Sequence, residues 1–415
     1  MSGIVLSAAV RQNLLSLQST AELLSTTQNR LASGKKVNTA LDNPTNYFTA
    51  QGLDNRASDI NNLLDSIGNG VQVLQAANTG LTSLQKLVDT AKSIANQVLQ
   101  TTTGYTVKAS ATSLAPTGAG VLGVAGTATD LTNGGTNSLA SPTPLTFVFT
   151  PATGTATTIT LGTGVGDVNS INAFNAALST AGLGLTASLA SNGSITLTST
   201  NDHASQTLTT GTARVANNIA ISGSDTAALV TPTGGVAGQP LADANSQVTR
   251  ANLVTQYNNI IAQITTTSQD ASFNGINLLF GDDLKLTFNE TGKSTLSISG
   301  VTYDAAGLGL AQLTASTDFL DNSSANAVIA KVSAASDQLR SEASALGSNL
   351  SIVQIRQDFA KNLINVLQTG SANLTLADSN EEAANSQALS TRQSIAVSAL
   401  ALSNQSQQSV LQLLR

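Results

Sequence analysis

A heptad pattern of apolar residues dominates the sequence between Pro44 and Gln100. Apolar positions recur there at alternating steps of three and four residues, with one shortened step near Leu81. The members of this seam include Leu53, Ile60, Leu64, Ile67, Val71 and Leu74. Asn43 is expected to cap the helix ahead of proline at its first position, and a helix ending near Gln100 is about 85 Å long. Helices of that length belong to elongated proteins.

A second long helix is expected to begin near Asn322, and its seam runs without a break from Leu339 to Leu367. We expect Gly370 to follow its last helical turn. The members of this second seam include Leu339, Leu346, Leu350, Val353, Ile364 and Leu367. Two long helices so far apart in sequence pair only if the intervening chain is an excursion. The sequence therefore predicts a mainly α fold: an elongated, antiparallel, coiled-coil-like rod with the excursion at one end.

Shorter seams flank the long ones. The first contains Val10, Leu14, Leu17, Leu24 and Leu31, and Ser33-Gly34 provides its stop. The last follows Ser379 and Glu382, which match a capping box. Its apolar positions include Leu389, Ala396, Leu400, Val410, Leu413 and Leu414. This last helix is apolar on more than one side, and we expect other molecules to provide part of its cover.

The middle of the chain changes composition and becomes rich in Gly, Thr, Ser and Ala. Short alternating runs at 146–149, 157–161, 183–189 and 194–198, with a helix around 169–178, predict a small β-rich domain. A disordered low-complexity insert is the alternative. After a helix starting near Ala244, two further runs at 284–288 and 294–298 predict a β-hairpin.

We expect three domains from these boundaries. Residues 1–42 and 372–415 form the first, residues 43–103 and 241–371 form the long-helix rod with its hairpin, and residues 104–240 form an outward α+β insert.

The composition argues against catalysis, metal binding and nucleic-acid binding. Charged residues are only 10%, the formal net charge is −6, cysteine is absent and His203 is the only histidine. Without a basic excess, non-specific nucleic-acid binding is disfavoured. A histidine-centred triad, a cysteine nucleophile and a histidine metal cluster are excluded, and we expect no enzyme activity and no cofactor. Neither a Sec-type signal nor a membrane-spanning run is visible, so we expect a soluble protein that leaves the cell, if it does, by another route.

One cofactor-like motif, Gly118-Ala119-Gly120-Val121-Leu122-Gly123, has the spacing GxGxxG. A dinucleotide site also needs a preceding strand and a following helix, and neither pattern is present. The sequons at Asn192, Asn289 and Asn322 are expected by chance in a chain this rich in Ser, Thr and Asn.

Three segments resemble bacterial flagellin. They are residues 29–38 with Asp42-Asn43-Pro44, then residues 272–279 with Leu308-Gly309-Leu310, and finally Val410-Leu411-Gln412-Leu413-Leu414-Arg415. Order, spacing and placement make the resemblance specific over about 4–100 and 244–415. More weakly, residues 168–198 look like a repeat module of flagellin inserts.

The resemblance implies an extracellular subunit of the flagellar filament, exported uncleaved through the flagellar type III apparatus. Its flanking helices would form the filament core and its long helices a second layer. Implied partners are further copies of the chain, the hook-associated junction and cap proteins, and a secretion chaperone. Thr90 stands where many flagellins have arginine, which argues against recognition by Toll-like receptor 5.

Two other functions stay open. The sequence around Asp42-Asn43-Pro44 resembles a pattern of the hook–filament junction protein, which is the first alternative. A secreted adhesin acting as a monomer is the second. For a filament subunit, we expect the flanking helices to fold on assembly, since isolated helices gain little from propensity alone.

Overall fold

The computed structural model describes residues 8–113, 145–152, 154–161, 165–190, 195–210, 218–223, 229–230, 239–315 and 317–413. The GxGxxG motif, the sequon at Asn192 and Leu414 lie outside these ranges. The chain divides into two compact units: Met1–Gln72 with Leu284–Ile298 and Ser348–Arg415, and Val73–Asp283 with Ser299–Gly347. Each unit is described by itself.

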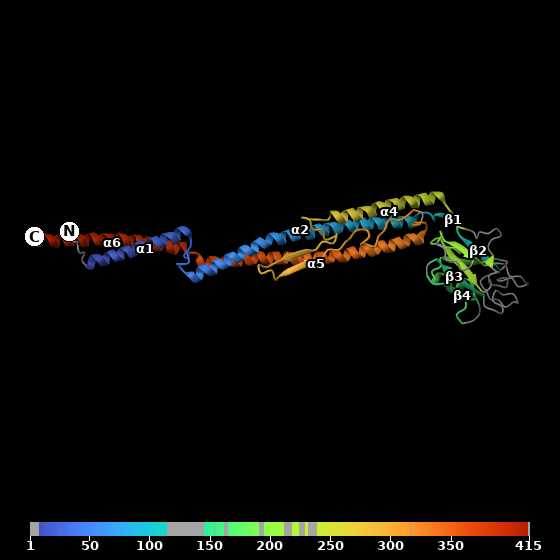
Figure 1. The fold of residues 1–415 in the computed structure, drawn as a ribbon, viewed down its shortest axis with the longest axis horizontal. Coiled ribbons are helices and arrows are strands. Elements are labelled where there is room, and N and C mark those ends of the chain that lie inside the picture. The colour runs from blue at the N-terminus through green and yellow to red at the C-terminus, as the bar shows by residue number, and fades with distance from the viewer. Residues whose placement is uncertain are drawn as a thin grey trace, which may run out of the picture. The chain divides into compact units, whose positions relative to one another are not determined.

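The first unit contains two helices that flank the long ones. Helix α1 spans Ala8–Ser33 and α6 spans Ser379–Leu413, and Figure 1 shows them side by side. Gly34 follows α1 with φ +66°, the left-handed conformation that glycine adopts easily at a helix end. The predicted end of the first helix is therefore confirmed.

Parts of both long helices belong to this unit. Helix α2 spans Pro44–Gln100 and α5 spans Asn322–Thr375. The Asn43 side chain accepts from Asn46 N at 3.0 Å, which confirms the predicted cap. A buried cluster joins α2 to α5 here and contains Ala57, Ile60, Ala360, Ile364 and Leu367.

The residues predicted to pack the long helices together are mostly inside. Those that are buried are Ile60, Ile67, Val71, Leu74, Leu339, Leu346, Val353, Ile364 and Leu367, and those half-buried are Leu53, Leu64 and Leu350. Their role as the packing surface of a rod domain stays a prediction, as do the three domain boundaries.

A β-hairpin completes the first unit. Strands β11 (Leu284–Thr287) and β12 (Thr295–Ile298) pair antiparallel, as predicted. Gly70 of α2 makes room for the hairpin, because a Cβ there would overlap Leu286 Cδ2 and stand 2.9 Å from Cδ1. Arg56 also pairs with Glu290 of the connecting loop at 2.9 Å.

Two predicted helix boundaries are wrong. Helix α5 does not stop at Gly370 but continues to Thr375, and a Cβ at Gly370 would stand 3.5 Å from Leu53 Cδ1. This glycine therefore lies close to α2 instead of ending its helix. Asp378, not Ser379, caps α6, because its Oδ1 accepts from Asn380 N at 2.9 Å and from Glu381 N at 3.3 Å.

The second unit contains the remainder of α2 and α5 with α4, which spans Ala244–Asp270 and lies along α2 in Figure 1. Arg250 of α4 is fully buried. Its guanidinium donates to Thr102 O, Phe319 O and Asn322 Oδ1. Two segments distant in sequence, one just after α2 and one at the start of α5, are thereby joined to α4.

The predicted β-rich insert is ordered in its described parts. One sheet has the order β5-β6-β2-β9 and comprises Leu185–Leu189, Ile195–Ser199, Ser110–Ser113 and Leu229–Val230. The other has the order β4-β3-β8-β7 and comprises Thr157–Leu161, Leu145–Pro151, Asn218–Gly223 and Thr207–Thr210. Strands β1 (Tyr105–Val107) and β10 (Leu241–Ala242) pair where the chain enters and leaves the insert.

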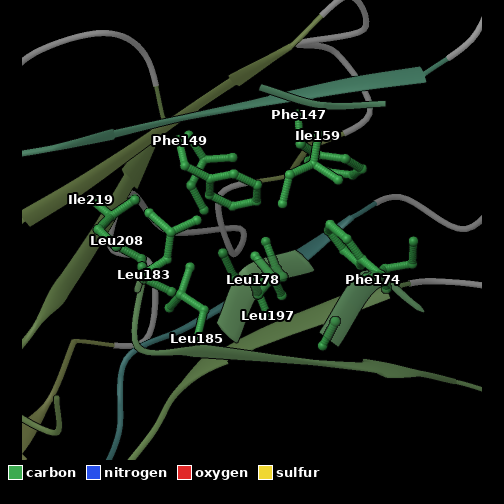
Figure 2. Close-up of a cluster of buried hydrophobic side chains, with 14 of the residues drawn as sticks. Phe147, Phe149, Ile159, Phe174, Leu178, Leu183, Leu185, Leu197, Leu208 and Ile219 are labelled. Carbon is green, nitrogen blue, oxygen red and sulfur yellow. The ribbon is translucent and has the colours of Figure 1, made fainter. Parts of the chain in front are cut away.

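Helix α3 (Ile171–Thr180) packs with both sheets. Figure 2 shows Phe174 and Leu178 of α3 directed into the cluster that contains Phe147, Phe149 and Leu185. The alternating Ile and Leu residues of the sequence thus form one shared core. A segment this rich in Gly, Thr, Ser and Ala folds because its few large apolar side chains pack into a single core.

Candidate assembly surface

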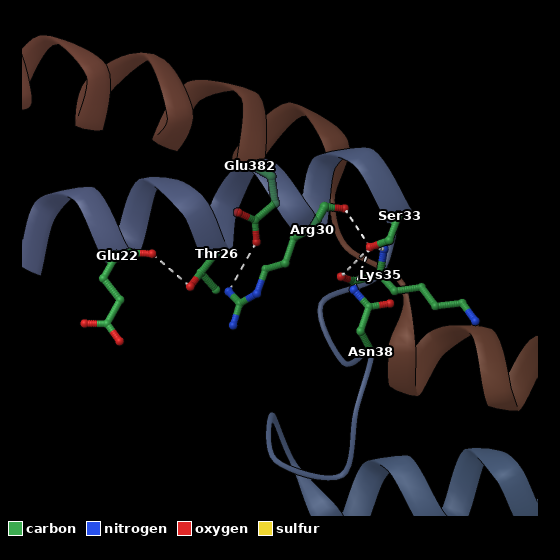
Figure 3. Close-up of polar contacts among 7 residues, drawn as sticks. All are labelled: Glu22, Thr26, Arg30, Ser33, Lys35, Asn38 and Glu382. Carbon is green, nitrogen blue, oxygen red and sulfur yellow. Dashed lines mark hydrogen bonds and ion pairs between the residues drawn. The ribbon is translucent and has the colours of Figure 1, made fainter.

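The pairing of α1 with α6 includes one ion pair between them. Arg30 Nη1 lies 3.4 Å from Glu382 Oε1, and Figure 3 shows the two side chains meeting between the helices. The Glu382 side chain is only 11% exposed. Glu382 also stands in the first turn of α6, where a negative charge complements the helix dipole. The pair therefore sets which turn of α1 faces the start of α6.

Backbone hydrogen bonds join the two connecting segments beside this pair. Lys36 N donates to Thr375 O at 2.7 Å, and Ala377 N donates to Gly34 O at 3.0 Å. The segment that follows α1 is thus tied to the segment that precedes α6. In the loop beyond, backbone N–H groups of Thr39 and Asn38 donate to the Asp42 carboxylate and hold its pKa below the ordinary value.

The structure places the predicted filament-core residues at different depths. Val10 is buried, and those half-buried are Leu17, Leu24, Leu389, Ala396 and Leu400. Leu14 and Leu31 are exposed. The structure describes the side chain of neither Val410 nor Leu413. Their shared role in assembly stays a prediction.

Several larger exposed residues on both helices were missed by the seam pattern: Leu15 (67% exposed), Leu23 (52%), Ile395 (64%) and Leu402 (69%). Val397 (50%), which the sequence places on a second seam of α6, is exposed as well. At ~100° per residue, Ile395 and Leu402 point nearly the same way, while Val397 lies on the opposite side of α6. A single partner helix therefore cannot cover α6. In the sequence, the signal for this exposed surface was the presence of large apolar residues outside the heptad seams.

Polar residues between these apolar ones are mostly uncharged. The charged residues of the pair are Arg11, Glu22 and Arg30 on α1 and Glu381, Glu382 and Arg392 on α6. Many hydroxyls bond within their own helix: Thr391 Oγ1 donates to Gln387 O at 2.9 Å and Ser398 Oγ to Ser394 O at 2.9 Å. Such hydroxyls already have an acceptor, so covering them loses less free energy than covering unpaired donors.

A second apolar stripe lies on α5 within the same unit. Ile352, Ile355, Phe359 and Val366 are all exposed, and helical periodicity places them within ~60° of one another. None belongs to the seam that faces α2. This stripe, like the exposed face of the helix pair, has the character of a surface that another protein covers.

The described residues offer little for chemistry. No group of three or more histidine, aspartate or glutamate side chains among them could hold a metal ion. His203 packs over Gly184, where a Cβ would overlap the imidazole ring. Within the same residues, no helix combines the length and apolarity needed to cross a membrane.

These features define a class: a mainly helical structural protein whose flanking helices pair and whose long helices carry a β-rich insert. Residues 5–115 match the bacterial flagellin N-terminal helical region, and residues 329–414 match the bacterial flagellin C-terminal helical region. Because both regions match in this order, the chain belongs to the bacterial flagellin family.

Curated relatives agree with this assignment. Flagellin FljM of Caulobacter vibrioides is 32% identical over 165 residues, which cover 39% of this chain and 59% of the relative. Flagellin FljK of the same organism is 31% identical over the same shares. Flagellin A of Rhizobium meliloti is 38% identical over 90 residues, 22% of this chain and 23% of the relative. The chain thus spans about three-fifths of the length of the first two.

Proposed function

We propose that this chain is the structural subunit that polymerises into the bacterial flagellar filament for swimming motility. The observation that carries the proposal is the apolar surface left uncovered on more than one side of the α1–α6 pair. Membership of the flagellin family supports it. In this role the pair forms the filament core and neighbouring subunits cover the exposed residues.

The exposed residues can contribute a large part of the free energy of association. Burying one Leu, Ile or Val side chain stabilises by about 1.5–3 kcal/mol. Leu15, Leu23, Ile395, Val397 and Leu402 together amount to on the order of 10 kcal/mol before the entropy of association is subtracted. Few charges must be desolvated, because most polar residues of the pair are Ser, Thr, Asn and Gln.

The helix pair is proposed to fold as the subunit joins the filament. In a lone subunit, α1 and α6 have only each other for cover, and isolated helices are marginal in water. Neighbouring subunits supply the missing apolar contacts and thereby stabilise the folded form. Circular dichroism of monomer and polymer measures this directly, with a higher helix content expected in the polymer. Equal helix content in the two states contradicts folding on assembly.

The stripe on α5 is proposed as a second contact between subunits. Ile355, Phe359 and Val366 lie on a helix that the filament model places in the layer outside the core. The insert would then project outward, where sequence changes disturb neither contact.

The remaining partners and the location follow from the proposed role. We propose an extracellular location in the filament, export through the flagellar type III apparatus, and contacts with the hook-associated junction protein, the cap protein and a secretion chaperone. No enzymatic activity is assigned to the chain. Nothing in the part of the chain that the structure describes favours the junction-protein or adhesin alternatives.

Seeded polymerisation tests the proposal. Purified monomer is added to short filament fragments, and elongation is followed by electron microscopy and sedimentation. The variant Ile395→Ser/Leu402→Ser removes two exposed apolar side chains from one face of α6 and is expected to raise the critical concentration at least tenfold. Losing about 1.4 kcal/mol of contact free energy corresponds to that factor.

A matched control separates a local effect from a general one. Val165→Ser/Leu241→Ser also removes two exposed apolar side chains, from the insert and its base. It should elongate filaments like the parent chain. If both double variants elongate normally, the α6 face is not an assembly surface. A parent chain that adds one layer to the seeds and then stops acts as a junction protein.

A further inference from the structure

Edge strand β5 carries a side chain that takes the place of a neighbouring strand. Among the described strands, β5 ends its sheet and has β6 on one side. On the other side, Asn175 Nδ2 donates to Ala187 O at 2.9 Å, and Asn175 Oδ1 accepts from Ala187 N at 2.6 Å. These two bonds are those that a residue of an adjacent antiparallel strand makes in a hydrogen-bonded pair.

The register of β5 shows why Ala187 is the residue that needs them. Thr200 N donates to Gly184 O, so the backbone groups of Gly184 face β6. By the alternation of an antiparallel ladder, Thr186 and Ser188 also face β6, whereas Leu185, Ala187 and Leu189 face outward. Ala187 stands at the centre of the outward set. Because Asn175 occupies the backbone groups of Ala187, the outward backbone groups that remain are those of single residues, Leu185 and Leu189, and not a continuous run.

Helix α3 holds Asn175 in this position. Its neighbour Phe174 and Leu178, one turn further along the helix, are buried in the insert core, as Figure 2 shows. The turn into β5 is short, since Gly182 and Gly184 adopt φ +63° and Leu183 N donates to Leu178 O. The amide is therefore held beside the strand by packing on one side and a tight turn at the end.

Other common protections are absent from this strand. The sequence Leu185-Thr186-Ala187-Ser188-Leu189 contains no lysine, no other charge and no proline, the residues that usually discourage edge pairing. Its exposed side chains are a threonine and a serine, which are compatible with a further strand. An edge of this kind pairs readily with another chain unless something occupies it.

We propose that Asn175 closes the β5 edge against strand pairing with a second copy of this chain. The insert is thereby kept a separate body even where many copies are close together. The inference goes beyond the proposed filament role and does not depend on it, because it concerns only α3 and β5.

The test uses the full-length chain, which contains no cysteine of its own. An antiparallel pair of β5 strands centred on Ala187 places Thr186 of one copy opposite Ser188 of the other. Thr186→Cys and Ser188→Cys are therefore prepared as separate proteins, each with and without Asn175→Ala. Monomers are mixed under oxidising conditions, and mixed disulfide dimers are measured by mass spectrometry. Alanine is the best helix former, so the substitution is compatible with α3.

With Asn175 present, mixed dimers should stay at the level of a control pair in which Thr112→Cys replaces Thr186→Cys. Thr112 is exposed on β2, between β6 and β9, and so offers no free edge. With Asn175→Ala, mixed dimers should rise at least tenfold for the edge pair only. Folded Asn175→Ala protein that gives no such rise overturns the proposal.

Hydrogen exchange on the unaltered chain gives a second measurement that needs no variant. The amide of Ala187 should exchange more slowly than the outward amides of Leu185 and Leu189. Equal exchange rates at the three positions also overturn the proposal. Seeded elongation of the Asn175→Ala protein separates this inference from the filament role. If that protein elongates filaments normally and yet forms new disulfides at β5, the substitution has affected only the strand edge.

Discussion

Arg30 and Glu382, which are 352 positions apart in sequence, place their Nη1 and Oε1 atoms 3.4 Å apart between α1 and α6. The glutamate is the more enclosed partner. Its position in the first turn of α6 gives it a second favourable interaction, with the helix dipole. This pair therefore aligns the beginning of α6 with the end of α1.

Charge substitution at this pair should weaken the helix pairing. Glu382→Gln removes the charge attraction and is expected to cost about 0.5–1 kcal/mol, the usual range for a partly exposed pair. Filament thermal stability, measured by the temperature of depolymerisation, should fall. In a double-mutant cycle with Arg30→Gln and Arg30→Gln/Glu382→Gln, the loss caused by Glu382→Gln should be smaller when Arg30 is already neutralised. Losses that simply add would show that the two residues do not interact.

Two glycines of α2 provide a matched pair of substitutions. Gly52→Ala meets nothing within 4 Å, and should stabilise α2 by up to about 1 kcal/mol because alanine favours helix. Gly70→Ala overlaps Leu286 of the hairpin, which is buried, and should destabilise by about 1–3 kcal/mol. Thermal unfolding of both variants measures the difference. Equal effects would mean that the hairpin does not pack against Gly70.

The buried guanidinium of Arg250 should not tolerate lysine. A lysine ammonium cannot reproduce the fork that reaches Thr102 O, Phe319 O and Asn322 Oδ1, so buried acceptors lose their donor. We expect Arg250→Lys to lower the free energy of unfolding by about 2–3 kcal/mol. Arg340→Lys, at an exposed position of α5, is the control and should change it little. Chemical denaturation provides the measurement.

Alkaline pH should destabilise the chain through Tyr257. Burial raises the pKa of this phenol from 10.0 to about 12. Because the folded state binds the proton more tightly, the stabilisation is complete below pH 10 and is lost as pH rises from there toward 12. Tyr257→Phe should flatten this part of the stability profile. Denaturant unfolding from neutral pH to about pH 12 measures the free energy of unfolding over this range. If that free energy falls with pH as steeply in Tyr257→Phe as in the parent chain, Tyr257 is not responsible for the loss.

Local signals predicted the helices well. Asn43 ahead of Pro44, and glycine after Ser33, mark helix ends through hydrogen bonds and dihedral angles of adjacent residues. The alternating runs of the insert likewise became strands, because the large residues at every second position share one face. The same reasoning failed at Gly370, where glycine lies close to Leu53 in another helix.

The candidate assembly surface was predicted only in part. The seams identified Val10, Leu17 and Leu24, but the most exposed apolar residues, among them Leu15 and Leu402, stand outside them. A heptad count finds the face that a helix turns to its first partner. It does not show how much of the other faces stays uncovered, since that depends on which elements are near.

What the sequence determined by itself is therefore what neighbouring residues decide: the limits of most helices, the strand runs and the scarcity of charge. The tertiary structure alone decided which distant groups meet. Arg30 with Glu382, Gly70 with Leu286 and Asn175 with Ala187 are examples. The physical reason is that a cap or a turn is made by adjacent residues. Burial, ion pairing and the closing of a strand edge depend instead on side chains that only the folded chain brings together.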